Sequence, residues 1–264
     1  MTSFTEILQR WDLTPDGDAI NSRNSHLLPV LTGDATQAII KIAKPHGRDE
    51  LTEKMLCCYD GLSAVRLIRA EHDITLMERA TGTKSLEAMA VNGEDLEATQ
   101  IICRVVCDLH KAPLPTGVPD LSETFAPLLS AASHPIFDAC VTSARALLSD
   151  PAKVALHGDI HHENILESTR GWLAIDPKGR IGPPQYDFAN LFLNPHTNTA
   201  FVLDPARMRN LANWISKTTG IDEICILHAA HAHAGLSACW TSNDPENQEY
   251  PLTAANLLHE ILHS

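Results

Sequence analysis

Short apolar or alternating runs dominate the first eighty residues of the chain and predict β-strands. Five such runs stand out, and turn-forming sequences such as TPDG and TGDA separate several of them: DGDAI, LLPVLT, QAIIKIA, AVRLIRA and DITLMERA. Between the third and the fourth run, Leu51, Met55, Leu56 and Tyr59 recur at helical spacing. This part of the chain therefore predicts a small sheet that carries one helix.

After Ala80 the apolar residues begin to recur at helical period. Between Glu94 and His110 they form one continuous stripe, which predicts an amphipathic helix. Asp204 as N-cap and Pro205 at the first helical position mark a clear start for a later helix. In all, further helices are expected over residues 122–131, 135–149, 205–218, 222–240 and 250–263.

A block of strands followed by a block of helices predicts an α+β protein with two lobes. We expect a small antiparallel-sheet N-lobe with one helix over residues 1–80 and a larger, mainly helical C-lobe over residues 81–264. The hinge between them falls near MERATGT, over residues 77–83.

The composition narrows the classes of partner. The chain has 33 Asp and Glu against 20 Lys and Arg, a formal charge of −13, and no local basic stripe. Such a surface would repel a phosphate backbone, so no nucleic acid partner is expected, whereas a cationic small molecule would suit it.

No apolar stretch approaches the roughly 18 residues of a membrane span, and the N-terminus lacks a signal-peptide pattern. Seven cysteines without a CxxC pair fit free thiols, and we expect a cytoplasmic protein with no membrane partner.

The sequence VALHGDIHHENIL gathers histidines, acids and an asparagine between apolar flanks. It could form a metal site, a catalytic loop or a polar turn. His157, Asp159 and Asn164 have the H-x-D-x-x-x-x-N spacing of a kinase catalytic loop, and Asp176 follows at the end of an apolar, strand-like run. Phosphoryl transfer needs a carboxylate that orients and deprotonates a hydroxyl, and two oxygen ligands that hold Mg²⁺ against nucleotide phosphates. These residues would supply all three groups.

The sequence HGDIHHENIL, followed by WLAIDPKGRIGPPQYDFANLF, resembles the aminoglycoside phosphotransferases, specifically their streptomycin 6-phosphotransferase and hydroxyurea-kinase branch. DELTEKMLCCYDGLSAVRLIRAEHDITLMERATG is similar to the small-lobe helix, strands and hinge of that branch, and VLDPARMRNLANWIS and HAGLSACW resemble its C-terminal helices. The resemblance implies a bilobal protein-kinase-like fold. It also implies ATP- and Mg²⁺-dependent transfer of the γ-phosphate to a hydroxyl of a streptomycin-like aminoglycoside, which would inactivate the antibiotic.

The resemblance further implies roles for single residues. Asp159 would be the catalytic base, and Asn164 and Asp176 the magnesium ligands. Lys41 would hold the nucleotide phosphates and pair with Glu50 at the start of the small-lobe helix.

Other parts of the nucleotide site follow from the same resemblance. Glu53, one turn after Glu50, is the alternative partner of Lys41. The hinge, including Glu78 and Ala80, would bind adenine through main-chain groups. The chain has no glycine-rich loop, and in its place stands NSRNSH. There Ser22, Asn24 and Ser25 would offer hydroxyls and main-chain N–H groups to phosphate.

The acceptor is expected to be a small cationic molecule. Its candidate contacts are Glu163 in the catalytic loop and Trp240, Asp244 and Glu246 after the helix over 222–240, because carboxylates near a Trp face suit a guanidinium or ammonium group. A polar surface loop explains the last three equally well. Lys178 could neutralise charge on the transferring phosphoryl group or could be a surface lysine.

Several alternatives stay open. The acceptor could be another small alcohol, a sugar or a hydroxyurea-like metabolite, and the protein could be a catalytically silent nucleotide-binding module. A histidine-rich metallohydrolase is a third hypothesis. However, His228, His231 and His233 lie in a predicted helix, where His233 would point about 140° away from His228 and the three could not converge on one ion.

Overall fold

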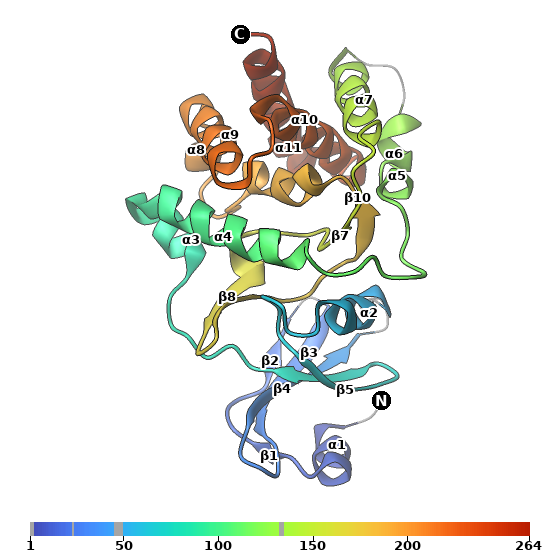
Figure 1. Ribbon diagram of the computed structural model, residues 1–264, viewed down its shortest axis with the longest axis vertical. Helices are drawn as coiled ribbons and strands as arrows, with labels where there is room; N and C mark the ends of the chain where they lie inside the picture. Colours follow the sequence, from blue (N-terminus) through green and yellow to red (C-terminus); the bar gives the residue numbers. More distant parts are fainter. Residues whose placement is uncertain (1–2, 23, 45–49, 132–134) are drawn as a thin grey trace.

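The structure is a computed structural model that describes residues 3–22, 24–44, 50–131 and 135–264 (Figure 1). Its N-terminal part contains an antiparallel sheet in the order β1-β3-β4-β6-β5, with β2 paired to β3. The strands of this sheet are β1 (Thr14–Pro15), β2 (Ile20–Asn21), β3 (Ser25–Leu31), β4 (Gln37–Ala43), β5 (Leu67–Glu71) and β6 (Ile74–Glu78).

The two faces of this sheet bury different residues because successive side chains of a strand point to opposite sides. On β4, Ala38 and Ile40 pack in a small core with helix α1 (Phe4–Trp11), whereas Ile39 packs against the main core that includes helix α2 (Glu50–Tyr59). We predicted one helix here, and the structure has two. The short helix α1 has a capping box between Ser3 and Glu6 that could have been recognised in the sequence.

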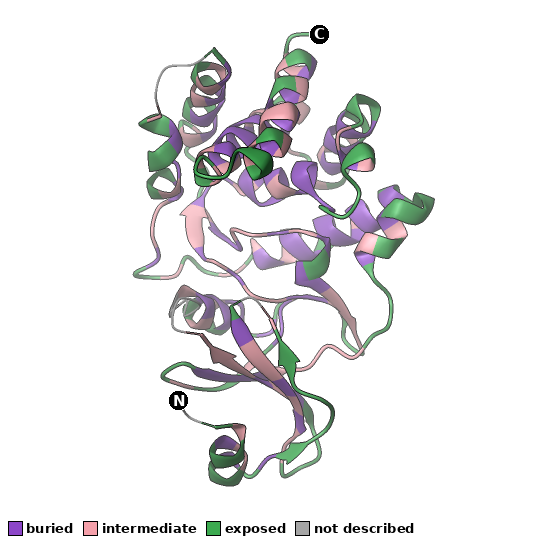
Figure 2. Ribbon diagram, turned by 180° about the vertical axis from the view of Figure 1, so that it is seen from behind, coloured by how far each residue is buried: buried purple, intermediate pink, exposed green. Residues whose placement is uncertain are grey.

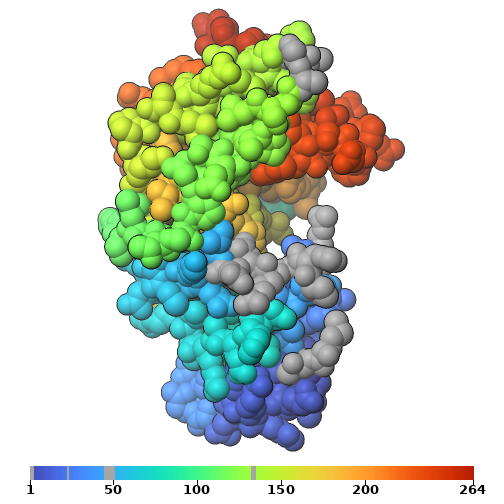
Figure 3. Space-filling view, turned by 90° about the vertical axis from the view of Figure 1, so that its right-hand side faces the viewer, coloured from blue at the N-terminus to red at the C-terminus, as the bar shows by residue number. Residues whose placement is uncertain are grey.

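The C-terminal part is mainly helical, as predicted, and Figure 3 shows it above the blue and cyan N-terminal part. Its helices are α3 (Leu86–Met89), the π-helical turn η1 (Ala90–Glu94), α4 (Asp95–Leu109), α5 (Leu121–Thr124), α6 (Ala126–Leu129), α7 (Pro135–Leu148), α8 (Thr199–Val202), α9 (Pro205–Thr219), α10 (Glu223–Trp240) and α11 (Pro245–Leu262). The remaining elements are β7 (Val154–Leu156), paired with β10 (Arg180–Gly182), β8 (Ile165–Ser168), paired with β9 (Gly171–Ala174), and the 3₁₀ segments η2 (His162–Asn164) and η3 (Pro184–Leu193). None of the described helices is long and apolar enough to span a bilayer.

Two predicted helix boundaries were wrong. The helix expected over 122–131 is divided into α5 and α6 at Phe125. The last helix begins at Pro245 instead of residue 250, because the Asp244 side chain caps it and Pro245 occupies its first turn. Pro251, which looks like a helix start in the sequence, lies inside the helix.

Helix α10 lies at the centre of the C-terminal part and is mostly buried (Figure 2). It packs against α7, α11 and η3. A Cβ atom at Gly235 would lie 2.5 Å from the Cβ of Cys140 on α7, so glycine is what allows these two helices to approach so closely.

Main-chain and side-chain bonds join the two parts of the molecule. The Val65 N–H donates to the Ala174 carbonyl across 3.1 Å, and the Ala174 N–H donates to the Ser63 carbonyl across 2.8 Å. Arg170, in the turn between β8 and β9, donates to both carboxylate oxygens of Glu78 at the end of β6. These bonds hold the N-terminal sheet against the β8–β9 hairpin. The predicted boundary between the two lobes, between residues 80 and 81, stays a prediction.

Candidate active site

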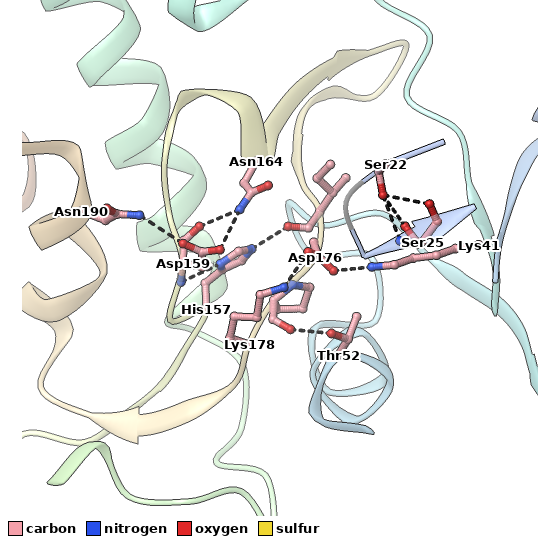
Figure 4. Close-up of polar contacts among 12 residues, drawn as sticks. Ser22, Ser25, Lys41, Thr52, His157, Asp159, Asn164, Asp176, Lys178 and Asn190 are labelled. Atoms are coloured by element: carbon pink, nitrogen blue, oxygen red, sulfur yellow. Dashed lines mark hydrogen bonds and ion pairs between the residues drawn. The ribbon is translucent and has the colours of Figure 1, made fainter. Parts of the chain in front are cut away.

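The loop between β7 and β8 carries the predicted catalytic residues, and buried hydrogen bonds hold its start in place (Figure 4). His157 is fully buried, and its Nε2 donates to the Ile175 carbonyl across 2.9 Å. Because Nδ1 accepts from the Asp159 N–H, the proton of the neutral ring lies on Nε2. Burial lowers the pKa of His157, which keeps the ring neutral.

A buried carboxylate holds the same loop from the other side. The main-chain N–H groups of His157 and Gly158 donate to the two oxygens of Asp187, at 2.9 and 2.8 Å. His110 Nε2 lies 2.8 Å from the same carboxylate. Gly158 has φ +83°, a conformation that glycine adopts without strain. The loop is therefore positioned before any substrate binds.

The carboxylate of Asp159 is oriented by two amides. Asn190 Nδ2 donates to Oδ1 across 3.1 Å, and Asn164 Nδ2 lies 3.4 Å from Oδ2 and 2.8 Å from the Asp159 carbonyl. Asn190, on η3, was missed by the sequence analysis. It lies within the segment YDFANLF that carries the family resemblance, but no motif marks it.

Asp176 lies between two lysines. Lys41 Nζ is 2.5 Å from Oδ1 and Lys178 Nζ is 2.6 Å from Oδ2 (Figure 4). Burial alone would raise the pKa of Asp176, but the two lysine charges outweigh it and lower this pKa to about 2. Its backbone is left-handed, with φ 56°, a conformation that aspartate tolerates better than most residues and that recurs at functional sites.

The predicted magnesium ligands have a suitable chemistry. Since the amide nitrogen of Asn164 donates to the Asp159 carbonyl, its oxygen points the other way and remains available to a cation. Asp176 adds an ionised carboxylate. One or two carboxylates with further neutral oxygens and substrate phosphates are the ligands that Mg²⁺ prefers.

The predicted phosphate-binding groups have partners of their own. Ser22 and Ser25 bind each other through their hydroxyls at 2.8 Å, and the Ser25 N–H donates to Ser22 Oγ. The carbonyl of Asn24 accepts from Lys44 N–H. Ser22 and Ser25 thus hold each other in place. The Glu50 side chain lies outside the described residues, so its pairing with Lys41 stays a prediction.

The hinge is tied into the sheet. The N–H groups of Glu78 and Arg79 donate to the carbonyls of Arg66 and Gln37, so these two donors are already used. The hydrogen bond from Arg170 is the main cause that lowers the pKa of Glu78. These bonds do not use the N–H of Ala80, and the contact of the hinge main chain with adenine stays a prediction.

A cavity of about 340 Å³ opens beside Asp159. Its lining combines polar side chains, imidazoles and an exposed indole: Thr124, Gly158, Asp159, Lys178, Arg180, Tyr186, Asn190, Leu193, His196, His233, Ser237 and Trp240. Asp159 is the only carboxylate among these lining residues, and Lys178 and Arg180 are cationic. The cavity can hold an acceptor against Asp159.

The four predicted acceptor contacts lie in different places. Trp240 lines the cavity, whereas Glu163, Asp244 and Glu246 do not. The Glu163 side chain is 66% exposed. Asp244 caps α11 by accepting from Asn247, and Glu246 is exposed in the first turn of that helix.

The histidines of α10 bind protein groups. Ser143 Oγ lies 2.9 Å from Nδ1 of both His228 and His231, and His233 Nε2 lies 3.3 Å from Asn190 Oδ1. Within the described parts of the chain, no three His, Cys, Asp or Glu side chains are arranged to hold a metal ion.

Comparison with known proteins reveals the family. A family model described as aminoglycoside/hydroxyurea antibiotic resistance kinase matches residues 10–245. The chain is 37% identical over 246 residues to a streptomycin 3''-kinase of Klebsiella pneumoniae, covering 90% of this chain and 91% of the relative. It is 29% identical over 198 residues to a streptomycin 6-kinase of Streptomyces glaucescens, covering 69% and 63%.

A solved structure supports the fold. A thermostable mutant of aminoglycoside phosphotransferase APH(4)-Ia, in a ternary complex with AMP-PNP and hygromycin B, superposes with a TM-score of 0.65 at 12% identity and covers 97% of each chain. The predicted bilobal protein-kinase-like fold is confirmed, and so is the resemblance drawn from the catalytic loop. The chain belongs to the aminoglycoside/hydroxyurea antibiotic resistance kinase family.

Proposed function

We propose that the protein transfers the γ-phosphate of ATP to a hydroxyl of streptomycin. One observation carries the proposal. The carboxylate of Asp159 and the side chain of Lys178 line the same acceptor cavity. Asp176, two residues before Lys178, binds Lys41 of the sheet. Lys178 thus connects the cavity that contains the base to Asp176 and Lys41, which we propose lie on the phosphate side. The names of the relatives support streptomycin as the acceptor.

The residues divide the chemistry among them. Asp159 orients the acceptor hydroxyl and takes its proton. The hydroxyl oxygen forms a bond to the γ-phosphorus while the bond from that phosphorus to the β,γ-bridging oxygen breaks, and ADP leaves. Mg²⁺ held by Asn164 and Asp176 would neutralise phosphate charge. Lys41 holds the phosphates, and Ala80 N–H binds adenine.

We propose the 3''-hydroxyl as the acceptor group in preference to the 6-hydroxyl. The 6-hydroxyl of streptomycin lies on the ring that carries two guanidinium groups, which would need carboxylate partners. The cavity offers the carboxylate of Asp159 alone and places two cations, Lys178 and Arg180, beside it. The sugar that carries the 3''-hydroxyl has one methylammonium group instead of two guanidinium groups, so it needs fewer carboxylate partners, and Ser237 and His233 can bind its hydroxyls. The more similar relative, a 3''-kinase, supports the same choice.

The test is ADP formation by the purified protein with Mg²⁺·ATP and streptomycin, and with hydroxyurea as a second acceptor. We expect streptomycin-dependent ADP release and a phosphate whose ³¹P–¹H coupling locates it on the 3'' carbon. Asp159→Asn, which preserves size, should lower turnover by about 10²–10⁴-fold. Phosphate at position 6 would refute the choice of hydroxyl, and ADP release with hydroxyurea alone would refute streptomycin as acceptor.

A further inference from the structure

Lys178 belongs to two parts of the site at once. Its Nζ lies 2.6 Å from Oδ2 of Asp176, a predicted magnesium ligand, and its side chain lines the acceptor cavity together with Asp159 (Figure 4). The γ-phosphoryl group must pass from the metal side to the acceptor side. Lys178 lies at that junction.

Two ammonium groups share the carboxylate of Asp176. Its single carboxylate faces two ammonium groups, Lys41 on Oδ1 and Lys178 on Oδ2. Lys178 is the more exposed of the two, at 34% of its side chain against 20% for Lys41, and it lines the cavity, whereas Lys41 does not.

The backbone of Lys178 is fixed to the catalytic loop. Its N–H donates to the His157 carbonyl across 2.8 Å, and the Gly179 N–H donates to the same oxygen across 3.1 Å. On the other side, Thr52 of α2 donates its hydroxyl to the Pro177 carbonyl across 2.8 Å in a buried hydrogen bond. The fixed backbone places the start of the Lys178 side chain, and the ion pair with Asp176 places its ammonium group.

We propose that Lys178 is a catalytic residue whose ammonium group binds the oxygens of the phosphoryl group during its transfer to the acceptor. The inference rests on the proposed kinase function. An Asp176 oxygen that binds a metal ion is no longer fully available to Lys178, and a phosphoryl oxygen can take its place. A cation at this position acts most strongly in the transition state, where charge develops on the transferring group.

A purely structural role would have different consequences. If Lys178 only held Asp176 in place, its removal would weaken nucleotide binding as much as turnover. If it acts on the transferring group, turnover falls while nucleotide affinity barely changes.

The first experiment compares Lys178→Met and Lys178→Arg with a matched control, Lys153→Met. Lys153 forms a similar lysine–carboxylate pair, 2.7 Å from Asp120, outside the site. We expect Lys178→Met to lower kcat by about 10²–10³-fold with KM for ATP within about threefold of the parent, as for loss of a charge-stabilising donor. Lys178→Arg should recover part of the loss, and Lys153→Met should behave as the parent. A Lys178→Met variant with the kcat of the parent would overturn the proposal.

The second experiment needs no acceptor, so it separates this proposal from the choice of streptomycin. Calorimetry measures the affinity of the protein for Mg²⁺·ADP with and without fluoroaluminate, which imitates the transferring phosphoryl group. We expect fluoroaluminate to tighten ADP binding in the parent and in Lys153→Met. In Lys178→Met this gain in affinity should be at least about tenfold smaller, whereas the affinity for ADP alone should equal that of the parent. An equal gain in Lys178→Met, no gain in the parent, or a matching loss of affinity for ADP alone would overturn the catalytic role.

Discussion

The side-chain amide of Asn190 donates to Oδ1 of Asp159 across 3.1 Å. The orientation of this amide is fixed, because Asn194 Nδ2 donates to its oxygen across 3.0 Å and leaves only the nitrogen to face Asp159. His233 Nε2 lies 3.3 Å from the same oxygen. Oδ1 of Asp159 therefore has the shorter of the two amide contacts, and Oδ2, which Asn164 Nδ2 approaches only to 3.4 Å, is the oxygen that we expect to receive the proton of an acceptor hydroxyl.

Replacing Asn190 should disturb catalysis without disturbing nucleotide binding. In Asn190→Leu the carboxylate of Asp159 loses its orienting donor, and we expect kcat to fall by about 10- to 100-fold, the usual effect of a small misplacement of a reacting group. KM for ATP should not change, since Asn190 lies on the acceptor side of Asp159. Steady-state kinetics with Asn256→Leu as a surface control tests this; unchanged kcat in Asn190→Leu would show that the hydrogen bond has no positioning role.

Asp176→Asn should weaken the binding of Mg²⁺·ADP. A neutral amide is a poorer ligand for a hard dication, and it also loses the ion pairs with Lys41 and Lys178. We expect turnover to be abolished and the magnesium dependence of ADP affinity, measured by calorimetry, to be lost. An equal magnesium dependence in the variant and the parent would remove Asp176 from the metal site.

A buried ion pair ties α4 to α9. Arg207 Nε lies 2.8 Å from Oδ2 of Asp95, Nη2 lies 3.2 Å from Oδ1, and the side chains are only 4% and 9% exposed. Removing one partner leaves the other charge buried, so Asp95→Leu should cost about 3–5 kcal/mol in the free energy of unfolding. Urea unfolding of Asp95→Leu, Arg207→Met and the double variant tests this. As a comparison, Lys153→Met removes an exposed ion pair and should lower the free energy of unfolding by less than about 1 kcal/mol. A double variant as unstable as the sum of the single variants would argue against the stranded-charge explanation.

Stability should fall in mild acid because His231 is buried in neutral form. Burial, followed by the neighbouring His259 and His228, lowers the pKa of His231 to about 3. The unfolded chain, with a pKa near ~6.5, then binds more protons than the folded protein below that pH. The contribution of His231 is therefore complete above pH ~6.5 and decreases as the pH falls toward ~3.

The loss attributable to His231 between pH 7 and 5 should be about 2 kcal/mol, at ~1.4 kcal/mol per pH unit below the unfolded pKa. Urea unfolding of the parent and of His231→Gln at both pH values measures it, because the other histidines contribute equally to both proteins. If the two proteins lose the same stability, His231 does not titrate as predicted.

The sequence by itself determined the fold class and the local part of the site. Periods of two and then of 3.6 residues predict a sheet followed by helices, because each element must bury one face. Asp159 and Asn164 lie five residues apart on one loop, so their proximity follows from the chain itself. Helix α1, which has only eight residues, was not predicted, and the start of helix α11 was predicted at residue 250, five residues after its actual start at Pro245.

Only the tertiary structure decided which distant groups meet. Asn190 reaches Asp159 across 31 residues of sequence and Lys41 reaches Asp176 across 135, and no local pattern encodes either contact. The acceptor cavity is built from the loops and helices of several elements, so its lining depends on how they pack. Asp244 follows Trp240 closely in sequence, yet its carboxylate caps α11 while Trp240 lines the cavity. The direction of a side chain is set by the path of the backbone and by the partners that packing brings to it, and spacing along the sequence contains neither.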